Sequence, residues 1–108
     1  MSACLKRNEP ILRLLHRLKP RVVRAVMREA PPDLIQTLCE CILNILKGNI
    51  KLNSAQRKKL ARYKHVLRIL GTKRPSLKKR KAYLQKGGLV GALLGPVLSV
   101  LRSLLRLG

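Results

Sequence analysis

The chain has 108 residues and a formal net charge of +21 at pH 7, because 25 lysines and arginines are balanced by only 4 aspartates and glutamates. This length is enough for one small domain with a modest core and argues against a second domain. The two histidines and four scattered acids form no acid–base pair or known catalytic motif, so we expect no enzymatic activity, no metal site and no cofactor.

Aliphatic residues recur with helical spacing along most of the chain, and no segment alternates as a β-strand would. Prolines and glycines divide the sequence into pieces of helical length. We therefore predict an all-α fold, a small bundle of about five short amphipathic helices with a hydrophobic C-terminal helical tail. The expected parts are a helical core domain (1–71), a basic linker with a short helix (72–88) and an amphipathic hydrophobic tail (89–108).

The first three expected helices span residues 11–19, 21–29 and 33–47. The first two place apolar and arginine side chains on opposite faces, with Ile11, Leu14, Leu15 and Leu18 predicted to be buried in one and Val22, Val23, Val26 and Met27 in the other. Apolar residues cover about half the circumference of the third, which predicts the central core helix, closed by Gly48. Cys39 and Cys41 lie near the edges of its apolar arc and are interpreted as buried, reduced thiols rather than metal ligands.

Two basic helices are expected after this core helix. The first starts at a cap formed by Asn53 or Ser54, with Gln56 completing a loose capping-box pattern, and ends at Gly71. Its apolar arc consists of Leu60, Tyr63, Val66, Leu67 and Leu70. The second starts after a cap at Ser76, runs to Lys86 and carries four consecutive cations at residues 78–81.

Positive charge accumulates toward the C-terminus, because all four acids lie in the first 40 residues and the other 68 residues contain 17 cations and no carboxylate. Only Tyr63 and Tyr83 are aromatic, so stacking surfaces for unpaired bases are nearly absent. This composition favours binding to the phosphate backbone of a nucleic acid, above all a duplex, without sequence preference. The candidate DNA-binding residues are Arg21, Arg24, Arg28, Arg57, Lys58, Arg62, Lys64, Arg68, Lys73, Arg74, Lys78, Lys79, Arg80, Lys81 and Lys86.

The C-terminal segment contains 13 uncharged residues from Leu89 to Leu101. As a helix they would extend about 20 Å. A helix that spans a bilayer needs about 20 apolar residues and a length of about 30 Å, so this segment is too short. The candidate membrane-contacting or helix-packing residues are Gly91, Leu94, Gly95, Pro96, Leu98 and Leu101. Four alternatives remain open: insertion into an anionic membrane, self-association, docking on a capsid protein, and completion of the protein's own core.

The basic body is followed by Lys86-Gly87-Gly88-Leu89 and then by Leu93-Leu94-Gly95-Pro96-Val97-Leu98. This arrangement resembles the small core-protein precursors, called X or mu, of adenoviruses and of the related adintoviruses and Polinton-type elements. The segments from Asn44 to Leu52 and from Ser76 to Gly88 are similar to the versions in adintoviruses and Polinton-type elements. The similarity to adenoviral mu itself covers only about the last third of the chain, from Lys73 onward.

The resemblance implies a virion core protein that binds and condenses a double-stranded DNA genome, located in the virion and the host nucleus. It also implies cleavage by a viral cysteine protease, with Gly87, Gly88 and Leu89 as the candidate cut site. Gln85 departs from that pattern, because the family has an aliphatic residue two positions before the glycine pair. The alternative function is a membrane-active protein that acts through its C-terminal amphipathic helix, and a cellular chromatin or ribosome-associated protein is a third possibility.

Overall fold

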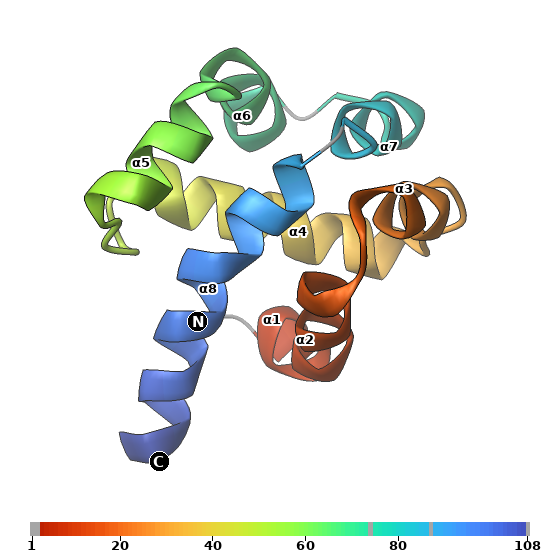
Figure 1. The fold of residues 1–108 in the computed structure, drawn as a ribbon. Coiled ribbons are helices and arrows are strands. Elements are labelled where there is room, and N and C mark those ends of the chain that lie inside the picture. Colours follow the sequence, from red (N-terminus) through yellow and green to blue (C-terminus); the bar gives the residue numbers. More distant parts are fainter. Residues whose placement is uncertain (1–2, 74, 87, 108) are drawn as a thin grey trace.

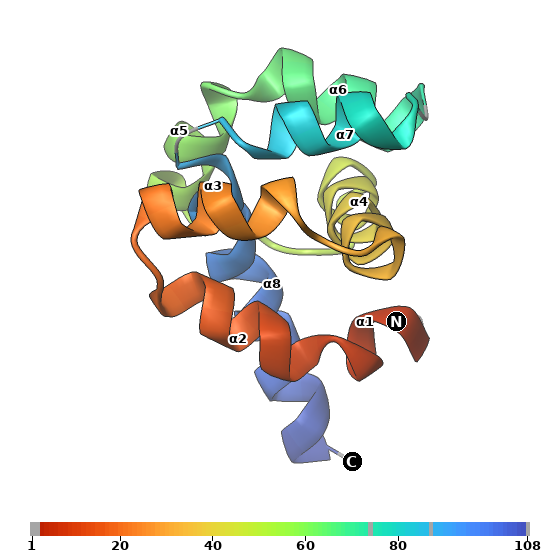
Figure 2. The same ribbon diagram turned by 90° about the vertical axis from the view of Figure 1, so that its right-hand side faces the viewer.

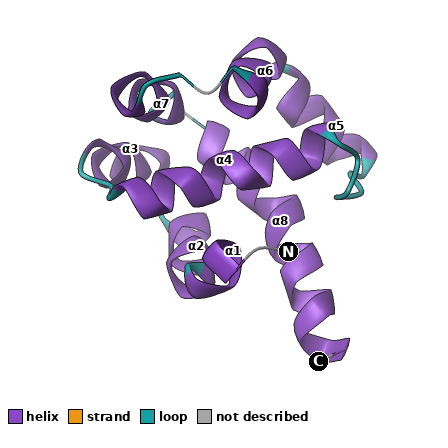
Figure 3. Cartoon of the chain, turned by 180° about the vertical axis from the view of Figure 1, so that it is seen from behind, coloured by secondary structure: helices purple, strands orange, loops and turns teal. Residues whose placement is uncertain are grey.

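One long helix, α4 (Pro32–Leu46), crosses the middle of the molecule and supplies much of its core. The computed structural model describes residues 3–73, 75–86 and 88–107, with side chains for residues 5–73, 75–86 and 88–99. Figures 1 and 3 show α4 behind α8 (Leu89–Leu107) from one side and in front of it from the other. Leu34, Ile35, Leu38 and Ile42 of α4 are at most 2% exposed, which confirms the prediction of a central core helix.

The described residues form eight α-helices and no strand, which confirms the all-α prediction and shows that the count of about five was wrong. Besides α4 and α8, they are α1 (Ala3–Arg7), α2 (Glu9–Arg17), α3 (Pro20–Arg28), α5 (Ser54–Ala61), α6 (Lys64–Thr72) and α7 (Leu77–Leu84). The radius of gyration is 12.8 Å, close to the about 13 Å expected for a compact chain of this length.

The count differs for two reasons. The short helix α1 precedes the first helix that the sequence predicted, and the helix expected from Asn53 to Gly71 is interrupted at Arg62 and Tyr63. At the interruption the Tyr63 amide donates to the carbonyl of Leu60 at 3.0 Å, which tightens the turn. The break lets α5 pack against α8 while α6 packs against α4.

Glycines and side-chain caps fix several helix ends. Asn53 and Gln56 form the predicted capping box, and the Ser76 side chain accepts from the Lys79 amide. Gly48 follows α4 with a φ of 79°, as expected for a C-terminal cap. Gly71 was wrongly predicted to end its helix: it lies inside α6, where an added Cβ would be 2.6 Å from Cδ1 of Leu46 on α4.

The buried face of α2 is rotated from the predicted one, and that of α3 is narrower than predicted. In α2, Leu12 and Leu15 are buried, while Ile11 and Leu14 are 42% and 58% exposed. In α3 the buried residues are Val23 and Met27. The apolar side chains of these short helices cover a wider arc than the one that contacts the core. The sequence alone therefore did not show which part of each arc would be buried.

The N-terminal half of α8 is part of the core. Leu89, Val90, Leu93, Leu94 and Val97 are at most 1% exposed, and α8 packs against α2, α4 and α5. The expectation of a hydrophobic tail is therefore wrong for residues 89–98, because their apolar side chains fill the space between three other helices. Figures 1 and 2 show that only the last turns of α8 extend beyond the rest of the molecule.

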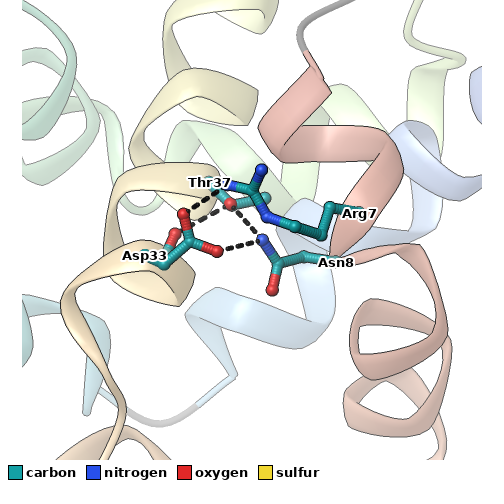
Figure 4. A network of polar contacts seen from close by, with 4 residues as sticks. All are labelled: Arg7, Asn8, Asp33 and Thr37. Carbon is teal, nitrogen blue, oxygen red and sulfur yellow. Dashed lines mark hydrogen bonds and ion pairs between the residues drawn. The ribbon is translucent and has the colours of Figure 1, made fainter.

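A small polar network joins the start of the chain to α4 (Figure 4). Asn8, which is buried, donates through Nδ2 to Oδ2 of Asp33 at 2.8 Å and to Oγ1 of Thr37 at 2.9 Å. Arg7 donates to Oδ1 of the same Asp33 at 2.7 Å, and the Thr37 hydroxyl donates to the Asp33 carbonyl. Four side chains from two segments therefore hold α1 and α2 against the first turns of α4.

Replacing Asn8 by alanine is expected to lower the free energy of unfolding by about 1–3 kcal/mol, because the buried Thr37 hydroxyl and the Asp33 carboxylate each lose a donor. Urea denaturation followed by circular dichroism measures the change. Asn49→Ala is the matched control, since Asn49 is exposed and its amide donates to Asn44 in a solvated hydrogen bond. Equal effects of the two variants would contradict a structural role for the network.

Candidate nucleic-acid interface

Three of the cationic helices lie side by side. Helix α7 packs against both α3 and α6, and Figure 2 shows it between them. Helix α5 leads into α6 through the turn at Arg62 and Tyr63. The structure thus brings residues 20–28 next to residues 64–84, which are far apart in the sequence.

Most of the predicted DNA-binding residues are exposed to solvent. The exposed ones are Arg21, Arg24, Arg28, Arg57, Lys58, Arg62, Lys64, Arg68, Lys73, Lys78, Lys79 and Lys86. Arg80 and Lys81 are half-buried, and Arg74 lies outside the described residues. Lys59 is also exposed on α5 but was not among the candidates, although it continues the run that starts at Arg57.

The carboxylates lie toward the start of the chain. Asp33 pairs with Arg7, and Glu9 pairs with Arg13 one helical turn along α2. Residues 41–108 contain no carboxylate, so α5, α6 and α7 cannot neutralise their own cations. The arrangement leaves a positive field over these helices that favours the approach of a polyanion.

Two of the candidate cations also make contacts within the protein. The Arg24 guanidinium donates through Nε to the carbonyl of Gln85 at 3.3 Å, which ties α3 to the C-terminal end of α7. The Lys86 ammonium lies 5.8 Å from the centre of the Tyr83 ring. Both side chains remain exposed, so they are held in place on the surface that would meet a phosphate backbone.

Arg80 has a different position from its neighbours in the cationic run. Its Nη1 donates to Oε1 of Gln36 at 3.3 Å, and its Nε is buried with no hydrogen-bond partner within the described part of the chain. Together with Cys39, Leu43 and Leu70 it lines a pocket of about 140 Å³ between α4, α6 and α7. Arg80 therefore packs α7 onto α4, and this role was missed because the sequence presents four identical charges in a row.

Cys39 and Cys41 are buried thiols, as predicted. Burial raises the pKa of the Cys39 thiol above its ordinary value of 9.0, while the nearby Arg80 guanidinium acts in the opposite direction. The thiol is therefore protonated at neutral pH and poorly suited to nucleophilic chemistry. Within the described residues, no group of histidine, cysteine, aspartate and glutamate side chains is arranged to hold a metal ion.

No relative is found. The sequence matches no model of a known protein family, and it matches no curated protein sequence. The fold matches no solved structure.

The candidate cut site lies at the junction between α7 and α8. Gly88 is exposed and has a φ of 82°, a left-handed conformation that favours glycine, and Leu89 is buried. Gly87 lies outside the described residues. Cleavage between Gly88 and Leu89 would require Leu89 to leave the core, so the processing that the resemblance implies stays a prediction.

The candidate membrane-contacting or helix-packing residues of α8 fall into three groups. Leu94, Pro96 and Leu98 are buried, Gly95 is half-buried near His16, and Gly91 is exposed. The side chain of Leu101 lies outside the described ones. In the part of the chain that the structure describes, no helix combines the length and the apolarity needed to cross a membrane.

Proposed function

We propose that this protein binds double-stranded DNA without sequence preference and condenses it, as a core protein of a virus-type particle. The observation that carries the proposal is the set of exposed cations on α3, α5, α6 and α7, of which the last three have no carboxylate of their own. Lysine and arginine side chains that neutralise phosphates release condensed counterions, and this release drives binding to any duplex.

Condensation needs the repulsion between neighbouring duplexes to fall. The helices α5, α6, α7 and α3 follow one another along one side of the molecule (Figure 1). Neutralisation of duplex phosphates by their cations would reduce that repulsion. The resemblance to the X or mu core proteins supports the same function and adds the virion and the host nucleus as the proposed locations.

The membrane-active alternative has less support. Leu94, Pro96 and Leu98 face the core rather than solvent, so they would have to leave it before they could enter a bilayer. DNA binding needs no such rearrangement, because the cations are exposed in the folded protein. Docking on a capsid protein and self-association stay as further proposals for the last turns of α8.

Electrophoretic mobility shifts with unrelated duplexes over a salt series test the proposed function. We expect similar affinities for all duplexes and a plot of log affinity against log salt with a slope steeper than about −4, since each neutralised phosphate contributes about −0.9. Light scattering at increasing protein-to-DNA ratios should report compact particles. A slope near zero, or a strong preference for one sequence, would contradict the proposal.

A further inference from the structure

A pocket of about 350 Å³ lies where α5 and the turn after it meet the beginning of α8. Its lining residues are Lys59, Arg62, Tyr63, Gly88, Gly91 and Ala92. Lys59 and Arg62 are exposed and no carboxylate takes part in the lining, so the pocket is positively charged and open to solvent. These residues come from two segments that are separated in the sequence, and the fold brings them together by packing α5 against α8.

Two glycines make room in this pocket. An added Cβ on Gly88 would lie 3.0 Å from the Tyr63 hydroxyl, so that hydroxyl lies directly against the glycine backbone. An added Cβ on Gly91 would have no atom within 4 Å, which means that the space in front of this residue is open. The pocket therefore combines a small, uncharged floor with two cations and a phenolic hydroxyl.

We propose that this pocket holds one phosphodiester group, with Lys59 and Arg62 as its cationic partners. Arginine and lysine form charge-assisted hydrogen bonds with phosphate oxygens. The inference rests on the proposed function, in which the phosphodiester belongs to the DNA backbone. It assigns one phosphate contact of the cationic surface to a named pocket.

Titration of the full-length ¹⁵N-labelled protein with dimethyl phosphate tests the pocket without using DNA. We expect saturable shifts of the Arg62 and Ala92 amide signals at constant ionic strength, and none at Gly95. Gly95 is the internal control, since it lies on α8 like Ala92 but outside the lining of this pocket. Equal responses of the three amides, or equal responses to dimethyl phosphate and sodium chloride, would overturn the proposal.

A neutral substitution separates this pocket from the general surface charge. Gly91→Leu fills the pocket, and we expect it to reduce the slope of log DNA affinity against log salt by about 0.9 and the affinity by about fivefold at 0.15 M salt. Ala61→Leu adds a leucine at an exposed position of α5 outside the pocket lining and should keep the wild-type slope. A wild-type slope for Gly91→Leu, with its helix content unchanged by circular dichroism, would overturn the proposal.

A parallel arm with phosphatidylglycerol vesicles distinguishes the source of the phosphodiester. Weaker vesicle binding by Gly91→Leu together with an unchanged DNA slope would overturn the assignment to DNA and place the group in a lipid. Absence of DNA binding by the wild-type protein would contradict the proposed function. The dimethyl phosphate titration would then still show whether the pocket binds a phosphodiester.

Discussion

Simultaneous replacement of Lys64, Arg68, Lys78 and Lys79 by glutamine is expected to weaken DNA binding by about a thousandfold at 0.15 M salt. All four side chains are exposed, two on α6 and two on the neighbouring α7. If each neutralises one phosphate, the loss is about fivefold per contact at this salt concentration. The slope of log affinity against log salt should become less steep by about 3.6, and fluorescence anisotropy with a labelled duplex measures both quantities.

The matched control removes the same charge from other parts of the molecule. Lys6, Arg17, Lys47 and Lys51 are also exposed, but they lie on α1, on α2 and around the loop between α4 and α5. Replacing these four by glutamine should change the slope of log affinity against log salt by less than about 0.9, the contribution of one phosphate contact. Equal losses in the two variants would mean that total charge decides binding, and the proposed location of the interface would then be wrong.

Both quadruple variants should keep the fold, so that a loss of binding can be interpreted. Glutamine has nearly the helix propensity of lysine and arginine, and the replaced groups lie outside the core. Removing four cations from a chain of charge +21 also reduces repulsion within the folded protein. The urea concentration at the midpoint of unfolding should therefore be unchanged or slightly higher in both variants.

The sequence predicted best those parts of the fold that depend on local periodicity. The apolar arc of α4 is wide enough to predict that this helix is buried. Leu60, Val66, Leu67 and Leu70 are buried as their helical spacing predicted, although the helix is interrupted at Tyr63. The break itself could not be predicted, because it depends on α5 and α6 packing against different helices. The position of α8 was left open among four alternatives for a similar reason, since an uncharged helix can be a tail or a core element.

The candidate interface was predictable in composition and less so in geometry. Helical spacing separates exposed from buried positions, which is why most of the candidate cations lie on the surface. It did not separate Arg80 from Lys79, because their neighbours in α7 are equally charged and Gln36, which accepts from Arg80, belongs to α4. The pocket beside Gly91 was not predictable, since it exists only where residues 59–63 meet residues 88–92.

Leu94→Ala is expected to lower the free energy of unfolding by about 2–5 kcal/mol, because the side chain is completely buried and its removal leaves a cavity. Leu14→Ala is the matched control within the same chain. Leu14 is 58% exposed on α2, so its replacement should change the free energy by no more than about 0.5 kcal/mol. Urea denaturation with a common m-value, followed by circular dichroism, compares the two variants.

The comparison decides whether α8 belongs to the folded body. A free hydrophobic tail would tolerate Leu94→Ala as well as the control, and equal stabilities would contradict the packing of α8 against α2, α4 and α5. A small domain is stable by only about 5–15 kcal/mol, so the loss of all the buried side chains of α8 would exceed the stability of the whole protein. Cleavage between Gly88 and Leu89 would therefore leave α8 bound in place, or leave a body that needs DNA to stay folded.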